Sequence, residues 1–289
     1  MSSRNETLIK AVLDETNMEN YTPLSRNEQF LKDIITKKDQ CTLKPISRIE
    51  EMYFNLHQKI KENSGGGGSL KTLLDATQST SNLFYNYKGT SVDGLISYSD
   101  TENVIKMNNT FYYCSNLTTI PLINTSSATN MHEMFYSCSN LTTIPLIDTS
   151  KCTNMKGIFR ECIALTTLPQ LDTSSATDMS SMFENCYKLT TIDITHMKIT
   201  SSYNSNSFAY ACRSLTKLII RNMDTIPNLD ATAFGGCYHF KGTTDPTYNP
   251  QGLKDGRIYV PDNKVEELKT ATNWSVYADI IVPLSTLVE

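Results

Sequence analysis

Hydrophobic and polar positions divide the chain into stretches with different periodicities. In residues 1–63, apolar side chains recur three and four residues apart, which predicts amphipathic helices. In residues 70–240 the apolar positions recur once every 24 residues or so, which is typical of stacked repeats. Residues 241–289 open with the turn-forming sequence KGTTDPTYNPQGLKDG before an apolar pattern returns. We therefore expect a helical segment, a repeat array and a C-terminal cap, with SGGGGS at residues 64–69 as a flexible linker.

The helices expected in residues 1–63 each begin with Ser-Arg-Asn-Glu or Ser-Arg-Ile-Glu. A serine at the N-cap and a glutamate three residues later form a capping box, here in the pairs Ser3/Glu6, Ser25/Glu28 and Ser47/Glu50. The arginine between them falls where the helix dipole disfavours a cation. Because such short helices need a partner, we expect an anchoring or oligomerisation surface here, formed with identical chains or another protein. Its residues would be Arg4, Arg26, Arg48, Phe30, Leu31, Ile49, Met52, Tyr53 and Leu56.

Four apolar columns and a cysteine column run through the repeats. The apolar columns are Met107, Met131, Met155 and Met179; Phe111, Phe135, Phe159 and Phe183; Leu117, Leu141, Leu165 and Leu189; and Ile120, Ile144, Leu168 and Ile192. The cysteines are Cys114, Cys138, Cys162, Cys186, Cys212 and Cys237. A residue that recurs once per repeat is typical of a buried column rather than of disulfide pairs. We therefore predict free, buried thiols.

The residue types in each segment of a repeat indicate the structure expected for that segment. The β-branched LTTIP segment predicts a strand, and strands of successive repeats would stack into a parallel sheet. The segment after it favours turns in which Asn124, Asp148 and Asp172 accept hydrogen bonds from amides two or three residues on. The NMxxMFxxC segment predicts a short helix with its Met, Phe and Cys pointing inward. LLDATQSTSNLF at residues 73–84 is interpreted as a degenerate first repeat.

The sequence LTTIPLIDTSKCTNMKGIFREC resembles the leucine-rich repeat of the bacterial-surface-protein type, over roughly residues 73–240. The resemblance implies an α+β fold: a leucine-rich-repeat solenoid with a parallel sheet, preceded by short N-terminal helices. It also implies a strand–helix–strand cap in residues 258–285, with Trp274 and Tyr277 packing on the last repeat. In function it implies a surface-exposed adhesive or recognition module rather than an enzyme.

Residues 1–69 are similar to leader segments on virion proteins of phages that infect Gram-positive bacteria. This similarity implies attachment to other virion proteins through residues 1–63, a homo-oligomer, and an array displayed at the virion surface after synthesis in the host cytoplasm. The array would then contact a host surface glycan or protein. A bacterial cell-surface or secreted leucine-rich-repeat adhesin is the alternative.

The composition and the motifs of the chain argue against several classes of function. A net charge of −4 without a basic cluster argues against nucleic acid, and the lack of a long apolar run argues against membrane insertion. We see no classical secretion signal at the N-terminus. No catalytic motif stands out, and the histidines lack partners at metal-ligand spacing, so we expect neither an enzyme nor a metal or other cofactor.

Two sets of residues are candidates for ligand contact. The first is a pair of threonine columns: Thr118, Thr142, Thr166 and Thr190, and Thr119, Thr143, Thr167 and Thr191. Strand alternation would point one column onto the sheet surface, where it would form either a polar ligand-binding face or a ladder that binds nothing. The second set is an aromatic patch that could stack on sugars or fill space between repeats: Tyr112, Tyr113, Tyr136, Tyr187 and Tyr210.

Overall fold

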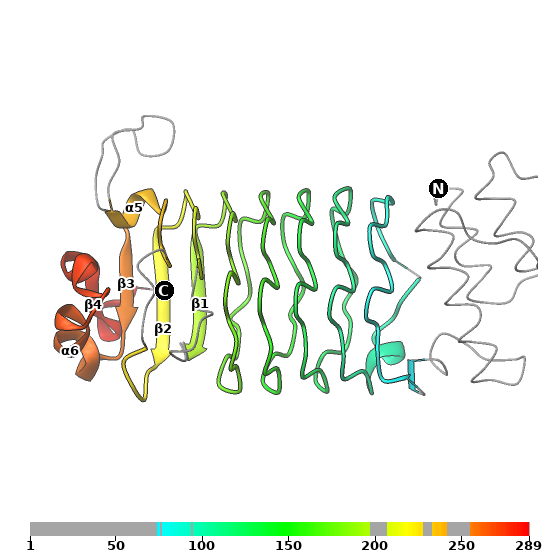
Figure 1. The fold of residues 1–289 in the computed structure, drawn as a ribbon, viewed down its shortest axis with the longest axis horizontal. Coiled ribbons are helices and arrows are strands. Elements are labelled where there is room, and N and C mark those ends of the chain that lie inside the picture. Colours follow the sequence, from blue (N-terminus) through cyan, green and yellow to red (C-terminus); the bar gives the residue numbers. More distant parts are fainter. Residues whose placement is uncertain are drawn as a thin grey trace, which may run out of the picture.

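The computed structural model describes residues 74–75, 77–93, 95–196, 207–227, 233–241 and 255–288. The fold is α+β, with a four-stranded parallel sheet and few helices. The sequence repeats lie side by side along the long axis of the molecule, and the C-terminal elements close one end (Figure 1). The helices expected in residues 1–63 lie outside the described residues.

The sheet occupies the C-terminal third of the chain. Its order is β1-β2-β3-β4 and every pairing is parallel. In the register, Ile192 lies opposite Leu218, which in turn lies opposite Ile258. The strands are β1 (Thr191–His196), β2 (Lys217–Asn222), β3 (Arg257–Val260) and β4 (Ile281–Pro283).

The predicted strand–helix–strand cap is confirmed. Between β3 and β4 the chain forms helix α6 (Val265–Thr270), and both strands extend the sheet. The Trp274 and Tyr277 rings pack on Phe234, with centroid distances of 6.2 and 5.5 Å. The Trp274 indole also donates to the Pro227 carbonyl. The other short helices are η2 (Ser99–Thr101), α5 (Tyr238–Lys241), η3 (Asp262–Lys264), η4 (Ser275–Ile280) and η5 (Leu284–Thr286).

The prediction of a strand in every LTTIP segment is wrong for the first three repeats. The structure forms no strand at residues 117–121, 141–145 or 165–169; the fourth such segment opens β1. Each strandless segment ends in a proline, whose nitrogen cannot donate to a ladder. At the equivalent position β1 has Asp193, which pairs with Ile219 of β2.

The predicted short helix in the NMxxMFxxC segment is also wrong, because the segment is a series of overlapping turns. Every second amide donates to the next repeat, as in Glu133 N to Lys156 O (2.9 Å) and Phe135 N to Ile158 O (2.9 Å). Glu133 and Ser137 have φ angles of 51° and 57°, which an α-helix does not contain. Within each repeat two residues four positions apart have positive φ, and the backbone alternates: one amide bonds to the next repeat and the following one closes a turn within the segment, as in Tyr136 N to Glu133 O (3.2 Å).

The core is a file of phenylalanines flanked by thiols. The rings from Phe84 to Phe183 stack nearly parallel, with centroids 5.4 to 5.7 Å apart. Phe84 in this file supports the interpretation of residues 73–84 as part of a first repeat. Each column thiol donates to a carbonyl of the preceding repeat, as in Cys162 Sγ to Phe135 O at 3.1 Å. The predicted free, buried cysteine column is confirmed.

Candidate functional site

Both threonine columns are on the surface, contrary to the expectation that only one faces outward. All eight threonines are exposed except Thr191, which is half-buried. Strand alternation does not apply to most of them, because only Thr191 lies within a strand. The columns therefore form one strip, with two adjacent threonines from each repeat.

Hydrogen bonding distinguishes the two columns. In the first, the hydroxyls of Thr118, Thr166 and Thr190 donate to a carbonyl one repeat back, as in Thr166 Oγ1 to Thr142 O (3.2 Å) and Thr118 Oγ1 to Thr90 O (3.2 Å). Within the described residues, no hydrogen bond engages the hydroxyls of the second column. The first column therefore supports the array, and the second is the part of the strip open to a ligand.

Two leucines beside the second column were missed by the sequence reasoning. Leu122 and Leu146 occupy equivalent positions in neighbouring repeats and are 53% and 69% exposed. The third repeat has the exposed Gln170 at that position, and this polar substitution was the available signal. The exposed groups of these repeats thus include two leucines, each three residues after a threonine of the second column.

The aspartates and asparagines of the turns are structural, as predicted. Asn124, Asp148 and Asp172 each accept from the amide two residues on, at 3.0, 3.0 and 2.9 Å. Hydrogen bonds from the backbone and hydroxyl of Ser174 hold the pKa of Asp172 below its usual value. These side chains therefore stabilise the turns of successive repeats.

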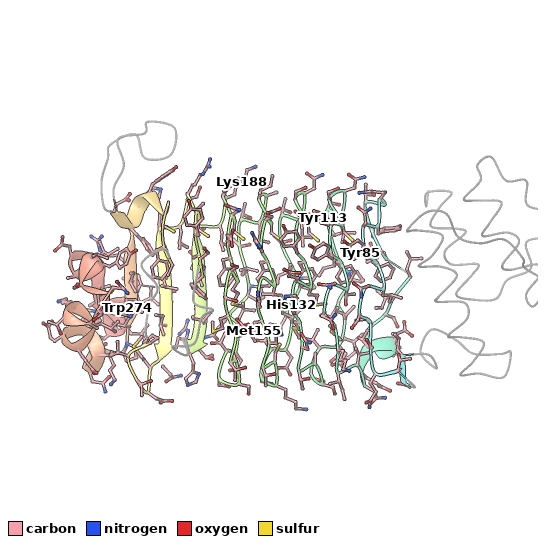
Figure 2. The ribbon with its side chains drawn as sticks, viewed as in Figure 1. Tyr85, Tyr113, His132, Met155, Lys188 and Trp274 are labelled. Atoms are coloured by element: carbon pink, nitrogen blue, oxygen red, sulfur yellow. The ribbon has the colours of Figure 1, made fainter. Side chains whose placement is uncertain are left out.

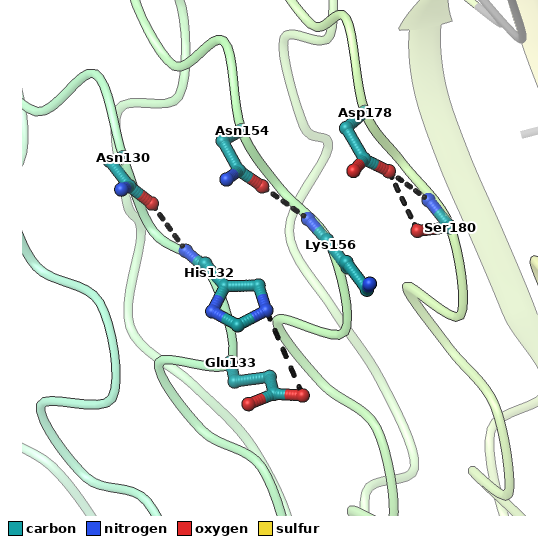
Figure 3. Close-up of polar contacts among 7 residues, drawn as sticks. All are labelled: Asn130, His132, Glu133, Asn154, Lys156, Asp178 and Ser180. Atoms are coloured by element: carbon teal, nitrogen blue, oxygen red, sulfur yellow. Dashed lines mark hydrogen bonds and ion pairs between the residues drawn. The ribbon is translucent and has the colours of Figure 1, made fainter. Parts of the chain in front are cut away.

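A second file of polar side chains stabilises the turn ladder (Figure 3). Asn130 Oδ1 accepts from His132 N (3.0 Å), and Asn154 Oδ1 accepts from Lys156 N (3.2 Å). In the next repeat Asp178 does the same for the backbone and hydroxyl of Ser180. The residue two after Asn or Asp is thereby held at the same place in each repeat.

Buried threonines connect neighbouring repeats from within. Thr125 Oγ1 accepts from Asp148 N at 2.7 Å, and Thr149 Oγ1 donates to Asp172 O at 2.8 Å. Thr173 bonds both the amide and the carbonyl of His196. These hydroxyls are engaged and inaccessible, unlike those of the surface strip.

Some of the five tyrosines fill space between repeats, and others are exposed to solvent. Tyr112 lies between Tyr85 (4.9 Å) and Tyr136 (4.7 Å) in a stacked trio, while Tyr113 is 41% exposed. Tyr85 and Tyr113 lie toward the same part of the array in Figure 2, far from Trp274 in the cap. Burial and the Glu133 carboxylate raise the pKa of Tyr112 to about 12.

The other two tyrosines of that set lie apart from this trio. Tyr187 lies under the Arg213 guanidinium at 4.3 Å from the ring centroid, and Tyr210 is 43% exposed. The five tyrosines therefore do not form one continuous patch. Tyr112 and Tyr136 fill space between repeats, and Tyr113 is the exposed ring beside them.

The family comparison is consistent with a repeated unit. The profile of a family described as a Mycoplasma protein of unknown function, DUF285, matches residues 78–190 and again residues 140–243. Together the two matches cover more than half of the chain. The chain belongs to the DUF285 family.

The first DUF285 match ends just before β1, and the second includes β1 and β2 but ends before β3 and β4. The two matches overlap at residues 140–190. No curated protein matches the chain significantly. The family description assigns no activity, so function has to be argued from the surfaces above.

Among the residues that the structure describes, the thiols of this DUF285 chain are buried, and two of the histidines lie beside carboxylates. Burial raises the pKa of the Cys162 thiol to about 12, which leaves almost none of the reactive thiolate at neutral pH. His239 bonds Asp255 (2.6 Å) and His132 lies near Glu133 (3.8 Å), on separate parts of the fold. In the part of the chain that the structure describes, no three His, Cys, Asp or Glu side chains could together hold a metal ion.

The residues predicted to anchor the chain belong to its N-terminal segment. The nine anchoring or assembly residues, from Arg4 to Leu56, lie outside the described residues. Among the described helices, none is both long and apolar enough to cross a membrane.

Proposed function

We propose that this chain is a phage virion accessory protein, a head or tail fibre or spike. Residues 1–63 anchor it to the particle as a homo-oligomer, and the array contacts the host cell surface. In this proposal it is not an enzyme, requires no cofactor, and neither binds nucleic acid nor inserts into a membrane.

The observation that carries the proposal is that each repeat contains two kinds of polar or apolar group: those that hold the scaffold together and those that remain exposed. Aspartates, buried threonines and thiols are committed to hydrogen bonds of the scaffold, as in Thr125 Oγ1 with Asp148 N and Cys162 Sγ with Phe135 O. The surface groups left over, such as Thr143 and Leu146, suit contact with another surface rather than bond-making chemistry. Contacts of this kind are individually weak, and several copies on one particle would supply avidity.

We also propose that the array is a solenoid of the leucine-rich-repeat type. The 24-residue spacing, the buried column Leu117, Leu141 and Leu165, and the parallel bridges between successive repeats support it. In such an array each repeat contacts only its neighbours, so the cap at β3 to β4 covers an otherwise open apolar end.

A bacterial cell-surface or secreted adhesin is the second candidate. It is favoured by the description of the DUF285 family, which names a bacterium. The same surfaces would serve either protein, and the two proposals differ only in what residues 1–63 attach to.

Immunogold electron microscopy with an antibody to the array tests the proposal. Gold on intact phage particles from an infected culture supports a virion protein, and gold confined to uninfected cell surfaces supports the adhesin. Absence of label from both sites would overturn both.

Anchoring is tested by incorporation of the variant Arg4→Ala, Arg26→Ala, Arg48→Ala into particles. We expect a loss of at least tenfold, because these cations would contact the partner. The matched control Lys10→Ala, Lys37→Ala, Lys38→Ala removes as much charge from the same segment and should be incorporated normally. Equal incorporation of both variants would contradict anchoring through the arginines.

A further inference from the structure

We propose that Tyr113 and the polar groups around it bind a neutral sugar ring of a surface glycan. This inference rests on the proposed attachment function and specifies the class of ligand. It concerns the turn side of the array and is independent of the threonine strip.

The stacking geometry leaves one face of Tyr113 open. Both faces of Tyr112 are covered, by Tyr85 on one side and Tyr136 on the other, with interplanar angles of 14° and 15°. Tyr113 is nearly perpendicular to Tyr112 (82°) and Tyr136 (87°), with centroid distances of 4.7 and 5.3 Å. The edges of these two rings therefore meet one face of Tyr113. The opposite face accounts for its 41% exposure.

The backbone conformation at Tyr113 does not favour an aromatic residue. Its φ of 58° lies in the left-handed region, which bulky residues rarely adopt. At the equivalent turn position neighbouring repeats have Asn86, Ser137, Glu161 and Asn185, also with positive φ. Residues without an aromatic ring thus suffice for the turn, and the ring stands there against local preference, which points to a role in binding.

Fixed polar groups lie beside Tyr136, whose ring centroid is 5.3 Å from that of Tyr113. The Glu161 carboxylate accepts from Ser137 Oγ (2.7 Å) and from the Tyr136 hydroxyl (3.1 Å). The Arg160 guanidinium lies 5.4 Å from the centroid of Tyr136 and pairs with Glu184 at 3.1 Å. Because these side chains are held by one another, they offer a pre-organised rim of donors and acceptors.

The charges of this rim select against other ligands. Glu161 and Glu184 outnumber Arg160, and Glu133 adds a third carboxylate close enough to raise the pKa of Tyr112. An acidic sugar or a phosphate would be repelled. A quaternary ammonium needs several ring faces around it, whereas the faces of Tyr112 are covered.

A neutral pyranose fits the exposed face of Tyr113 and the polar rim. One side of such a ring presents C–H groups that can stack on an open aromatic face, and its hydroxyls both donate and accept hydrogen bonds at the rim. One ring on one tyrosine binds weakly, so measurable attachment needs several copies of the chain.

The test compares the full-length chain with the variant Tyr113→Asn on immobilised neutral oligosaccharides of hexoses and N-acetylhexosamines. Asparagine occupies the equivalent position at Asn86 and Asn185, so the turn should be preserved. The matched control is Tyr98→Asn, which removes a tyrosine that is 52% exposed and outside this cluster. Saturation-transfer NMR with a bound oligosaccharide reports whether sugar C–H groups contact tyrosine.

We expect the full-length chain to bind at least one oligosaccharide, Tyr113→Asn to lose at least tenfold in apparent affinity, and Tyr98→Asn to bind like the parent. Lack of binding by the parent, or equal binding by Tyr113→Asn, overturns the inference. If gold labelling still places the chain on particles or cells, only the sugar site has failed. If the chain is on neither, the proposed attachment function has failed with it.

Discussion

Two regions of the array differ in how the segment after the threonine pair bonds to the neighbouring repeat. We call residues 107–190 the proline-containing repeats and residues 191–288 the strand region. Each of the first three repeats has a proline after its threonine pair, Pro121, Pro145 or Pro169, and no strand there. In the strand region the equivalent positions are Asp193 and Ile219, which pair across β1 and β2.

The aromatic file changes at the same boundary. Phe159 and Phe183 are stacked with an interplanar angle of 10°, whereas Phe183 and Phe208 meet at 87° and Phe208 and Phe234 at 86°. The spacing also lengthens there, from 24 residues to 25 and 26. Spacing alone does not explain the change of ring angle, because Phe84 and Phe111 are 27 residues apart and still stack at an interplanar angle of 1°. What distinguishes the strand region is the strand pairing of β1 to β4. The turn ladder and the thiol-to-carbonyl bonds run through both regions, so the regions differ in parallel ring stacking and in strand pairing.

The largest expected effect comes from removing one stacked ring. Phe135→Ala should cost about 3–5 kcal/mol because the ring is fully buried between Phe111 and Phe159. Hydrogen exchange should show the loss in the proline-containing repeats, while amides of β2 to β4 stay protected. Phe208→Ala is the counterpart in the strand region. If Phe135→Ala weakened β2 to β4 as much as its own repeats, the regions would not be separate.

A smaller effect is expected from a buried hydroxyl. Thr125→Val keeps the shape but leaves the Asp148 amide without its acceptor, which should cost about 1–3 kcal/mol. Thr119→Val is the matched control, because its side chain is exposed and its loss should stay within about 0.5 kcal/mol. Denaturant unfolding of both variants measures the difference, and equal values would mean that the buried column does not connect the repeats.

The smallest change in stability, and the sharpest test of the comparison, is the variant Pro121→Ile, Pro145→Ile, Pro169→Ile. Restoring the three amides should let these segments pair as strands, with a net change of about 1 kcal/mol or less. The new amides should then be protected in NMR hydrogen exchange. Leu146→Gln, which introduces the residue found at Gln170, is the control and should add no protection. Unprotected amides in the triple variant would show that proline is not what separates the regions.

Much of the fold could be predicted from the repeat alone. A column such as Phe111, Phe135 and Phe159 is apolar in every repeat, and burial follows directly. The turns at Asp148 and Asp172 follow from local side-chain chemistry. The strands and helix of the cap were implied by the resemblance to leucine-rich-repeat proteins rather than by local chemistry. The exposure of Leu122 and Leu146 was not predicted, because an apolar residue in an apolar segment reads as core.

The sequence by itself determined which residues recur, and therefore which are buried and which form turns, because both depend on spacing and local chemistry. Only the tertiary structure decided how the backbone between them bonds. The turn ladder at Glu133 and Ser137 exists because amides find carbonyls in the next repeat, and no residue carries that information alone. The open face of Tyr113 is likewise decided by Tyr85, Tyr112 and Tyr136, which only stacked repeats bring together.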